Sequence, residues 1–338
     1  MVWGLPAGSR TSSQASRAGR YPHIHDLLLT RDRQTGILST QFIQIWLVAL
    51  IGFLVMAEMG CLSAQDTATA DPSGVRNVVT LDESRLNESS GLAVSRRVEN
   101  HFWTHNDSGS KARLYAFDST GRKTGMIRLQ SVPAIDWEDM ASFTDQSVAR
   151  LLIADCGDNN ALRSSVALHL FDEPNPIAPK DPKRIQTITV AYPDGPRDCE
   201  AVAVDEHRRQ ILLVSKHLLP TAGSYEVPLP VRESKSTSEA VTAKRIGTLP
   251  LPMVTAMDVQ QESGDIWIVS YFQAFCFANT NRDSLLSKQL GRLPQPFELP
   301  RWKQIEAVAV DAARNTWLTS EGSPAQLGRL PPPKNDSR

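Results

Sequence analysis

The stretch "DCEAVAVDEHRRQILLVSK", residues 198–216, places a carboxylate, Glu200, at the start of an apolar, strand-like run. A nearly identical phrase, "QIEAVAVDAARNTWLTSEG", returns at residues 304–322 with Glu306 in the same place. A strand that enters a hydrophobic core normally begins with an apolar residue, so a repeated Glu at this point needs an explanation. The repetition itself predicts that the chain is built from similar structural units.

Five segments share the pattern of a polar residue followed by a small or apolar strand, at intervals of 48, 62, 55 and 51 residues. Each is followed by a second and a third strand-like run, and the first four by a fourth, which in the fourth unit is "KQLGRLP", residues 288–294. Four short strands in about 50 residues are typical of a β-propeller blade, so we predict an all-β, five-bladed β-propeller. The five segments are "SGLAVS" from Ser90, "EDMASF" from Glu138, "EAVAVD" from Glu200, "TAMDVQ" from Thr255 and "EAVAVD" from Glu306.

The last unit lacks a fourth strand of its own, because the chain ends shortly after its third. The segment "RNVVTLD", residues 76–82, can supply the missing strand, and the ring then closes without an open sheet edge. We expect the propeller over residues 78–331 and a disordered tail over 332–338. No further start motif suggests a sixth blade, and the charged run "RESKSTSE", residues 232–239, is predicted to be a solvated loop.

The N-terminal residues belong to a different class. A basic leader, residues 1–41, is expected to be disordered, and it precedes the apolar run "FIQIWLVALIGFLVMA", residues 42–57. That run is shorter than the roughly 20 residues of a membrane span, as in a signal peptide, and small residues predict cleavage after Ala64. Segment 42–64 is therefore a signal peptide or, if uncleaved, a membrane anchor, followed by a linker over 65–77. Either alternative places the propeller outside the cytoplasm, periplasmic, secreted or anchored to the membrane.

The composition limits which partners the protein can bind and which disulfides it can form. The 338 residues carry a formal net charge of −1, with 36 basic and 37 acidic side chains, which argues against nucleic-acid binding. In an oxidising space the globular part would hold three cysteines, Cys156, Cys199 and Cys276, and an odd number leaves at least one unpaired. A disulfide between Cys156 and Cys199 stays open as an alternative. No paired C-x-x-C suggests zinc.

The repeated carboxylates gain a role in a propeller. The first strand of each blade lines the central channel, so the residue before it lies at one mouth of the channel. Converging carboxylates repel one another in a partly desolvated space unless protonation, a basic side chain or a cation neutralises them. Hard oxygen donors without His or Cys suit Ca²⁺, which we predict as the cofactor; the alternative is that these residues cap strands through hydrogen bonds. The predicted metal ligands are Ser90, Glu138, Glu200, Thr255 and Glu306.

The order Ser, Glu, Glu, Ser/Thr, Glu at the blade starts resembles the calcium-activated apyrase family. The segments "FWTHNDSGSKARLYAFD" (102–118), "DWEDMA" (136–141) and "QIEAVAV" (304–310) are also similar to that family's blades. The resemblance implies a secreted five-bladed propeller with one Ca²⁺ on its axis and nucleotidase activity. The chain also resembles bacterial propellers that carry N-D-S-G, D-W-E-D, G-D-N and Y-P-D-G, for which the resemblance implies no activity.

The chain departs from the apyrase pattern in its arginines. The first-blade turn reads "NDSG" where the family continues into Arg-Thr-Gly, and "LLVSKHLLP" offers only Lys216 and His217 where the family has a Pro-Arg-Arg cluster. Arginine forks are favoured for clamping phosphate, so the sequence favours binding over hydrolysis. No nucleophile elbow, H-E-x-x-H or P-loop supports a serine hydrolase, zincin or kinase.

Two function classes follow. The first is a Ca²⁺-containing binding module of the cell envelope, recognising a small anionic ligand, a carbohydrate or an envelope protein. The alternative is a Ca²⁺-dependent hydrolase of phosphate anhydrides or esters. In the hydrolase, Lys216 and Arg163 would hold the anionic substrate while Asp107 or Asp158 orients a water molecule.

Overall fold

The computed structural model describes residues 71, 73–107, 109, 111–130, 132–232 and 237–333. Residues 69–338 form one compact unit, which contains all the described strands. The leader, the apolar segment 42–57 and the cleavage site expected after Ala64 lie outside the described residues, so what the sequence predicts for them stays a prediction. Within the described ranges, no helix is long and apolar enough to cross a membrane.

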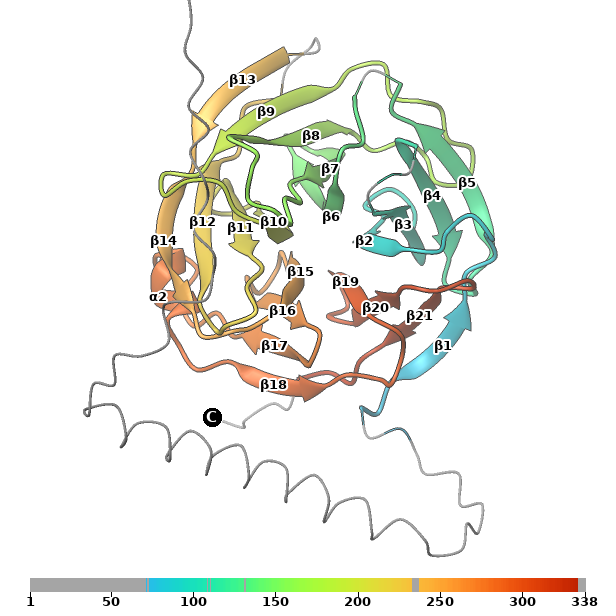
Figure 1. Cartoon of the computed structure of the whole chain (residues 1–338). Coiled ribbons are helices and arrows are strands. Elements are labelled where there is room, and N and C mark those ends of the chain that lie inside the picture. Colours follow the sequence, from blue (N-terminus) through green and yellow to red (C-terminus); the bar gives the residue numbers. More distant parts are fainter. Residues whose placement is uncertain are drawn as a thin grey trace, which may run out of the picture. The chain divides into compact units, whose positions relative to one another are not determined.

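Five sheets stand in a ring around a central axis, the channel of the sequence prediction, which makes the fold a five-bladed β-propeller (Figure 1). From the channel outwards, blade 1 consists of β2 (Ser89–Val94), β3 (His101–Asn106), β4 (Arg113–Asp118) and β5 (Lys123–Arg128). Blade 2 consists of β6 (Trp137–Asp145), β7 (Val148–Asp155), β8 (Val166–Asp172), β9 (Gln186–Ala191) and β13 (Thr237–Thr242). Blade 3 consists of β10 (Cys199–Asp205), β11 (Gln210–Ser215), β12 (Ala222–Pro228) and β14 (Lys244–Leu249). The predicted fold class and the five start motifs are confirmed.

Blade 4 consists of β15 (Val254–Val259), β16 (Ile266–Ser270), β17 (Gln273–Phe277) and β18 (Gln295–Glu298). Blade 5 consists of β19 (Ile305–Val310), β20 (Thr316–Ser320), β21 (Gln326–Arg329) and β1 (Arg76–Thr80). The strand from the front of the propeller completes the last blade, because β1 pairs antiparallel with β21, with Val79 opposite Leu327. The predicted closure of the ring is confirmed.

The outer strand predicted for blade 4 is wrong. Part of residues 288–294 lies in a short helix, α2 (Leu286–Leu290), and the fourth strand is β18, further along the chain. Leu286 and Leu290 are one helical turn apart, and both pack into the core between blades 3 and 4. β18 contains Pro296, which the outermost strand of a sheet tolerates because one side of it forms no ladder hydrogen bonds.

The charged run at residues 232–239 is also only partly a loop. β13 begins at Thr237 and pairs in parallel with β9, so the segment between β12 and β14 reaches back and adds a fifth strand to blade 2. Most residues of β13 are exposed, and this strand therefore shows no buried alternation by which its sequence could have predicted it.

The "EAVAVD" strands are apolar on both faces because each lies between two other blades. In β10, Val202 and Val204 pack into the core shared with blade 2, whereas Ala201 and Ala203 pack into the core shared with blade 4. β19 repeats this division, with its valines toward blade 4 and its alanines toward blade 1. Successive side chains of a strand point to opposite faces, so small and large residues alternate between the two neighbouring cores.

A buried carboxylate joins three of the blades below the mouth. Asp139 on β6 accepts hydrogen bonds from the backbone N–H of Met140 at 2.8 Å, of Val202 on β10 at 2.8 Å and of Met257 on β15 at 3.1 Å. Burial raises the pKa of Asp139 well above its usual value, while the three donors lower it. The first strands of blades 2, 3 and 4 are thus held in register next to the candidate site.

Candidate metal centre

The start of the first strand in each blade lies at one end of the channel, which we call the mouth. Loops that precede the first strands, and loops that follow the second strands, all meet at this end. The five predicted ligands stand at this end, and all are buried: Ser90, Glu138, Glu200, Thr255 and Glu306.

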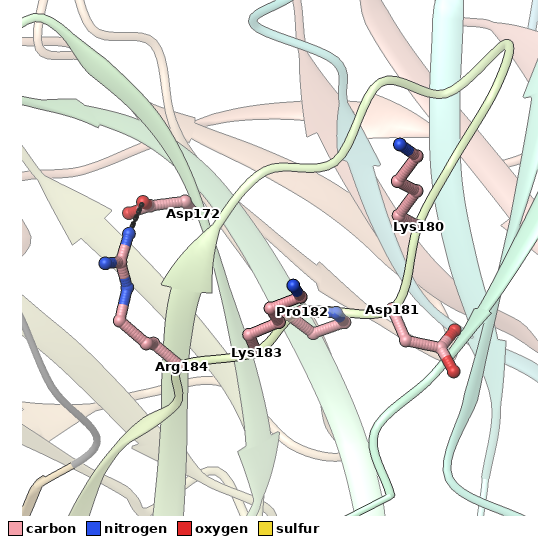
Figure 2. A pocket seen from close by; sticks show the side chains of 6 residues that line it. All are labelled: Asp172, Lys180, Asp181, Pro182, Lys183 and Arg184. Carbon is pink, nitrogen blue, oxygen red and sulfur yellow. Dashed lines mark ion pairs between the residues drawn. The ribbon is translucent and has the colours of Figure 1, made fainter.

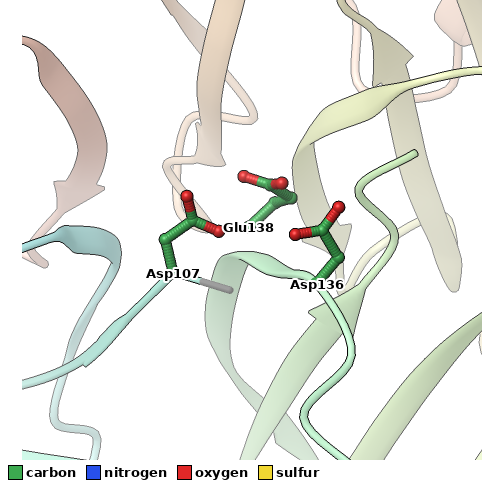
Figure 3. A group of neighbouring side chains, drawn as sticks. All are labelled: Asp107, Asp136 and Glu138. Carbon is green, nitrogen blue, oxygen red and sulfur yellow. The ribbon is translucent and has the colours of Figure 1, made fainter. Parts of the chain in front are cut away.

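Carboxylates gather on one side of the mouth, contributed by blades 1, 2 and 3. Oxygen atoms of Asp107, Asp136 and Glu138 lie within 4.8 Å of one another, and Figure 3 shows the three side chains converging. A second group with the same spacing joins Glu138 to Asp198 and Glu200. We call these five residues the acidic half of the mouth.

Glu138 belongs to both groups, so its carboxylate lies close to those of four other residues. Its side chain is about 5% exposed, and among the described residues no hydrogen-bond donor reaches its carboxylate. Burial, followed by the charges of Glu200, Asp107, Asp136 and Asp198, raises its pKa well above the usual value. A buried carboxylate that lacks donors and faces other carboxylates is stabilised by a cation.

The loop backbone beside these carboxylates is fitted closely to them. Gly157 donates its N–H to the carbonyl of Asp136 at 3.2 Å, and a Cβ at this position would overlap the carboxyl groups of Glu138 and Asp136. Burial, with Asp107 and Asp198, raises the pKa of Asp136 to about 6. Any residue larger than glycine would displace two of the clustered carboxylates.

The other side of the mouth carries its own positive charge. The ammonium of Lys216 donates to Glu200 Oε1 at 2.5 Å and to the hydroxyl of Tyr271 at 3.0 Å. The Tyr271 hydroxyl in turn donates to Glu306 Oε1 at 2.9 Å, and Gln304 Nε2 donates to the same oxygen at 3.2 Å. We call Lys216, Tyr271, Gln304 and Glu306 the lysine half of the mouth.

The charge states differ accordingly. Burial lowers the pKa of Lys216, but Glu200 and Tyr271 outweigh it and the pKa is raised above its usual value. Burial raises the pKa of Glu200 to about 8, against the lowering effect of Lys216. Burial and Glu321 likewise raise the pKa of Glu306 to about 7. Lys216 therefore remains an ammonium ion in contact with the ring.

The two hydroxyl-bearing ring positions serve the joints between blades. Ser90 Oγ on blade 1 donates to the carbonyl of Glu138 at 2.6 Å, and Thr255 Oγ1 on blade 4 donates to the carbonyl of Ile305 at 3.1 Å. Each bond crosses to the next blade. As both hydroxyls are engaged in this way, the carboxylates are the stronger candidates for ligands.

Among the four candidate catalytic residues, Asp107 and Lys216 lie at the mouth, in its two different halves. Asp158 and Arg163 stabilise the loop between β7 and β8. The Asp158 carboxylate accepts the N–H of Leu162 at 2.9 Å and of Arg163 at 2.7 Å. The guanidinium of Arg163 donates to Asp155 Oδ1 at 2.8 Å, and the N–H of Asp158 donates to Asp198 Oδ1 at 2.8 Å. This loop thereby helps to place Asp198.

Three members of the acidic half are absent from the ring predicted from the sequence: Asp107, which was predicted as a catalytic residue, and the pair Asp136 and Asp198. A signal for both was present, because each stands two residues before a ring glutamate, as in "DWE" and "DCE". The equivalent residue in the last blade is Gln304, in "QIE". Tyr271 follows the second strand of blade 4, which predicts that it lies at the mouth, although the sequence did not assign it to the ring.

The cysteines near the mouth are thiols. Cys156 and Cys199 are both buried and free, and Cys156 Sγ donates to the carbonyl of Cys199 at 2.9 Å. Cys276 is also buried and free. The disulfide considered from the sequence is not formed in this structure.

A separate cavity of about 520 Å³ lies away from the mouth, beside the loop between β8 and β9 (Figure 2). Lys180, Lys183 and Arg184 line it, and Arg184 forms an ion pair with Asp172 at 3.7 Å. Asp172 and Asp181 also line it, so its charges are mixed, in contrast with the acidic half of the mouth.

Fold and site together define a five-bladed propeller with an acidic channel mouth, whose clustered carboxylates could hold a metal ion. No protein-family model and no curated protein sequence matches the chain. Among solved structures, a glucose dehydrogenase is similar with a TM-score of 0.45 at 10% identity, covering 76% of this chain and 99% of its own. A gluconolactonase from Xanthomonas campestris is similar with a TM-score of 0.41 at 13% identity, covering 80% of this chain and 96% of its own.

Proposed function

We propose that the chain is a Ca²⁺-dependent binding module of the cell envelope, and that the ion lies in the acidic half of the mouth rather than on the channel axis. The observation that carries the proposal is the environment of Glu138. Its carboxylate is buried and has no hydrogen-bond donor among the described residues, and it belongs to both clusters of carboxylates whose oxygen atoms lie within 4.8 Å of one another. Glu138, Asp136 and Asp198, with Asp107 and Glu200, would hold the ion.

The donor set favours calcium over other ions. All five groups are carboxylates, and Ca²⁺ takes six to eight oxygen ligands in flexible geometry. The two clusters contain no His or Cys, the ligands that zinc prefers. When bound, the ion would neutralise the clustered charge and offer open positions to an oxygen atom of a ligand, as carboxylate, hydroxyl or phosphate oxygen.

Binding is better supported than phosphate hydrolysis because the nearby cations are engaged. Lys216 is held by Glu200 and Tyr271, and Arg163 is held by its own loop. An apyrase-like site would need cations free to clamp a polyphosphate. The hydrolase remains a second candidate because Asp107 lies beside Glu138, where it could orient a water molecule near the ion.

The test uses residues 69–338, since the compact unit holds the whole ring, its closing strand and its cores. The melting temperature is recorded with a chelator, with Ca²⁺, with Mg²⁺ and with Zn²⁺, and Ca²⁺ binding is measured by calorimetry. A ligand at 100 times its Kd stabilises a protein by about 2.7 kcal/mol, so saturating Ca²⁺ should raise the melting temperature clearly. If Ca²⁺ changes neither the melting temperature nor the calorimetric signal, the proposed metal site is contradicted.

A screen of nucleoside di- and triphosphates and phosphodiesters separates the two candidates. The binding module predicts no turnover with Ca²⁺ present. Turnover that Asp107→Ala abolishes, with the fold retained, would favour the hydrolase instead.

A further inference from the structure

The mouth is surrounded by exposed apolar side chains as well as carboxylates. Of the large hydrophobic residues that are exposed in the described chain, five lie in loops at the mouth, between 57% and 80% exposed. We call them the apolar rim. They are Ile135, Leu162, Leu218, Leu219 and Phe272.

The rim is carried by the same loops that form the metal centre. Ile135 directly precedes Asp136, Leu218 and Leu219 closely follow Lys216, and Phe272 directly follows Tyr271. Leu162 belongs to the loop whose backbone contacts Asp198. On the side of blades 2, 3 and 4, a ligand that approaches the proposed ion would therefore pass the rim.

Hydrogen bonds of the loop backbone fix the positions of most rim residues. The N–H of Ile135 donates to Asp155 Oδ2 at 3.0 Å, that of Leu162 to Asp158 Oδ1 at 2.9 Å, and that of Phe272 to Ser270 Oγ at 3.2 Å. The carbonyl of Leu219 accepts the N–H of Thr221 at 2.7 Å. Loops fixed in this way keep large apolar groups in water, although burying each of them would be favourable.

We propose that the mouth docks on an anionic phospholipid surface, with the rim inserted among the lipids and the ion bridging to headgroup phosphates. Several apolar side chains on separate projecting loops suit a lipid interface, where they enter to the depth of the headgroups. The acidic half would be repelled by anionic lipid unless a cation neutralised it, so docking requires Ca²⁺. The calcium dependence rests on the proposed function above.

The experiment is sedimentation of residues 69–338 with vesicles of equal parts phosphatidylglycerol and phosphatidylcholine, and with vesicles of phosphatidylcholine alone. This fragment lacks the apolar segment 42–57, whose own membrane affinity would otherwise contribute. We expect binding to the anionic vesicles with Ca²⁺ and release by a chelator. The double variant Leu218→Ser/Leu219→Ser should reduce the partition coefficient at least about tenfold, because two leucines that would otherwise insert among the lipids are lost.

Leu293→Ser is the matched control. Leu293 is 98% exposed and lies between α2 and β18, at the end of the ring opposite to the mouth, so its replacement should leave vesicle binding unchanged. Melting curves of both variants check that the ring is intact.

Several outcomes overturn the proposal: no vesicle binding, equal binding by the double variant, or equal binding to neutral vesicles in chelator. A self-association that the double variant loses, measured by ultracentrifugation, would make the rim a protein contact instead. Calorimetry without vesicles separates the two proposals, since Ca²⁺ binding without vesicle binding leaves the metal centre standing and removes only the docking.

Discussion

The acidic half and the lysine half of the mouth start from the same sequence pattern and neutralise their buried carboxylates differently. In blades 2 and 3 the ring glutamate follows an aspartate by two residues, and the carboxylates accumulate without an internal counter-ion at Glu138. In blade 5 the equivalent residue is Gln304, and Glu306 is reached by Tyr271 and, through it, by Lys216. A sequence repeat of five similar units thus folds into a mouth without five-fold symmetry, because the ammonium ion of Lys216 contacts only one side of it.

The largest effect is expected from removing the carboxylate on which the acidic half depends. Glu138→Gln should weaken Ca²⁺ binding by about 100-fold, because calcium affinity follows the number of charged ligands. The matched variant Glu306→Gln, in the lysine half, should change the affinity only slightly. Calorimetric titration of both variants makes the comparison, and equal losses would mean that the ion lies on the channel axis.

The next effect concerns the internal cation. Lys216→Met leaves Glu200 and Glu306 without their positive partner, and breaking a buried ion pair costs about 3–5 kcal/mol. Urea unfolding in chelator should show this loss. Ca²⁺ should bind the variant about tenfold more tightly, or in a second equivalent, because Glu200 then faces only like charges.

A calcium affinity that falls in Lys216→Met would contradict the separation of the two halves. It would mean that Lys216 supports the metal site rather than replacing an ion. Lys216→Arg serves as the control, since it keeps the charge.

In chelator, carboxyl groups of both halves should contribute to the pH dependence of the unfolding free energy. In Ca²⁺, mainly those of the lysine half should contribute. The folded-state pKa values of Asp136, Glu306 and Glu200 are raised to about 6, about 7 and about 8 from ordinary values of 3.8 and 4.5. A carboxyl group with a raised folded-state pKa favours the folded state at low pH and loses this contribution as the pH rises. Stability in chelator should therefore fall between about pH 4 and pH 8.

Urea unfolding at several pH values within that range measures the slope. Saturating Ca²⁺ should flatten it, because the ion takes the place of the protons on the acidic half. A slope that Ca²⁺ leaves unchanged would argue against an ion among these carboxylates.

The smallest effect is expected for Tyr271→Phe. It removes the hydrogen bond to Glu306 and one partner of Lys216, at a cost of about 1 kcal/mol in unfolding free energy. Ca²⁺ affinity should be unaffected, since Tyr271 lies in the lysine half. A large change in affinity would show that the two halves are coupled.

The ring could be predicted from the sequence because each blade repeats one local pattern. The "EAVAVD" strands carry alternating small and large residues, and this alternation corresponds to the two cores on either side of β10 and β19. The fourth strand of blade 4 is hard to predict, because β18 is only four residues long and contains Pro296, which an outer position tolerates. β13 was missed because its pairing with β9 is distant in sequence and leaves little burial.

The site was predictable in position and less so in composition. The mouth and its three glutamates follow from the repeat, whereas the contact of Lys216 with Glu200 depends on the direction of the Lys216 side chain at the end of β11, where the Lys216 N–H also donates to the carbonyl of Asp198 at 3.1 Å. The clustering of Asp136 and Asp198 around Glu138 depends in the same way on the loops before β6 and β10. Loop paths of this kind are set by tertiary contacts, and no local residue pattern specifies them.

The strand that closes the ring also sets an order of events during synthesis. β1 leaves the ribosome before any other strand of the propeller, yet its partner β21 is the last strand to be made. Until then, blade 5 cannot be completed, and contacts between such distant segments form slowly. A product truncated before Gln326 would keep four blades and two unpaired sheet edges, which are sites for aggregation. The pairing of β1 with β21 thus makes the complete chain the smallest unit in which blade 5 has all four of its strands.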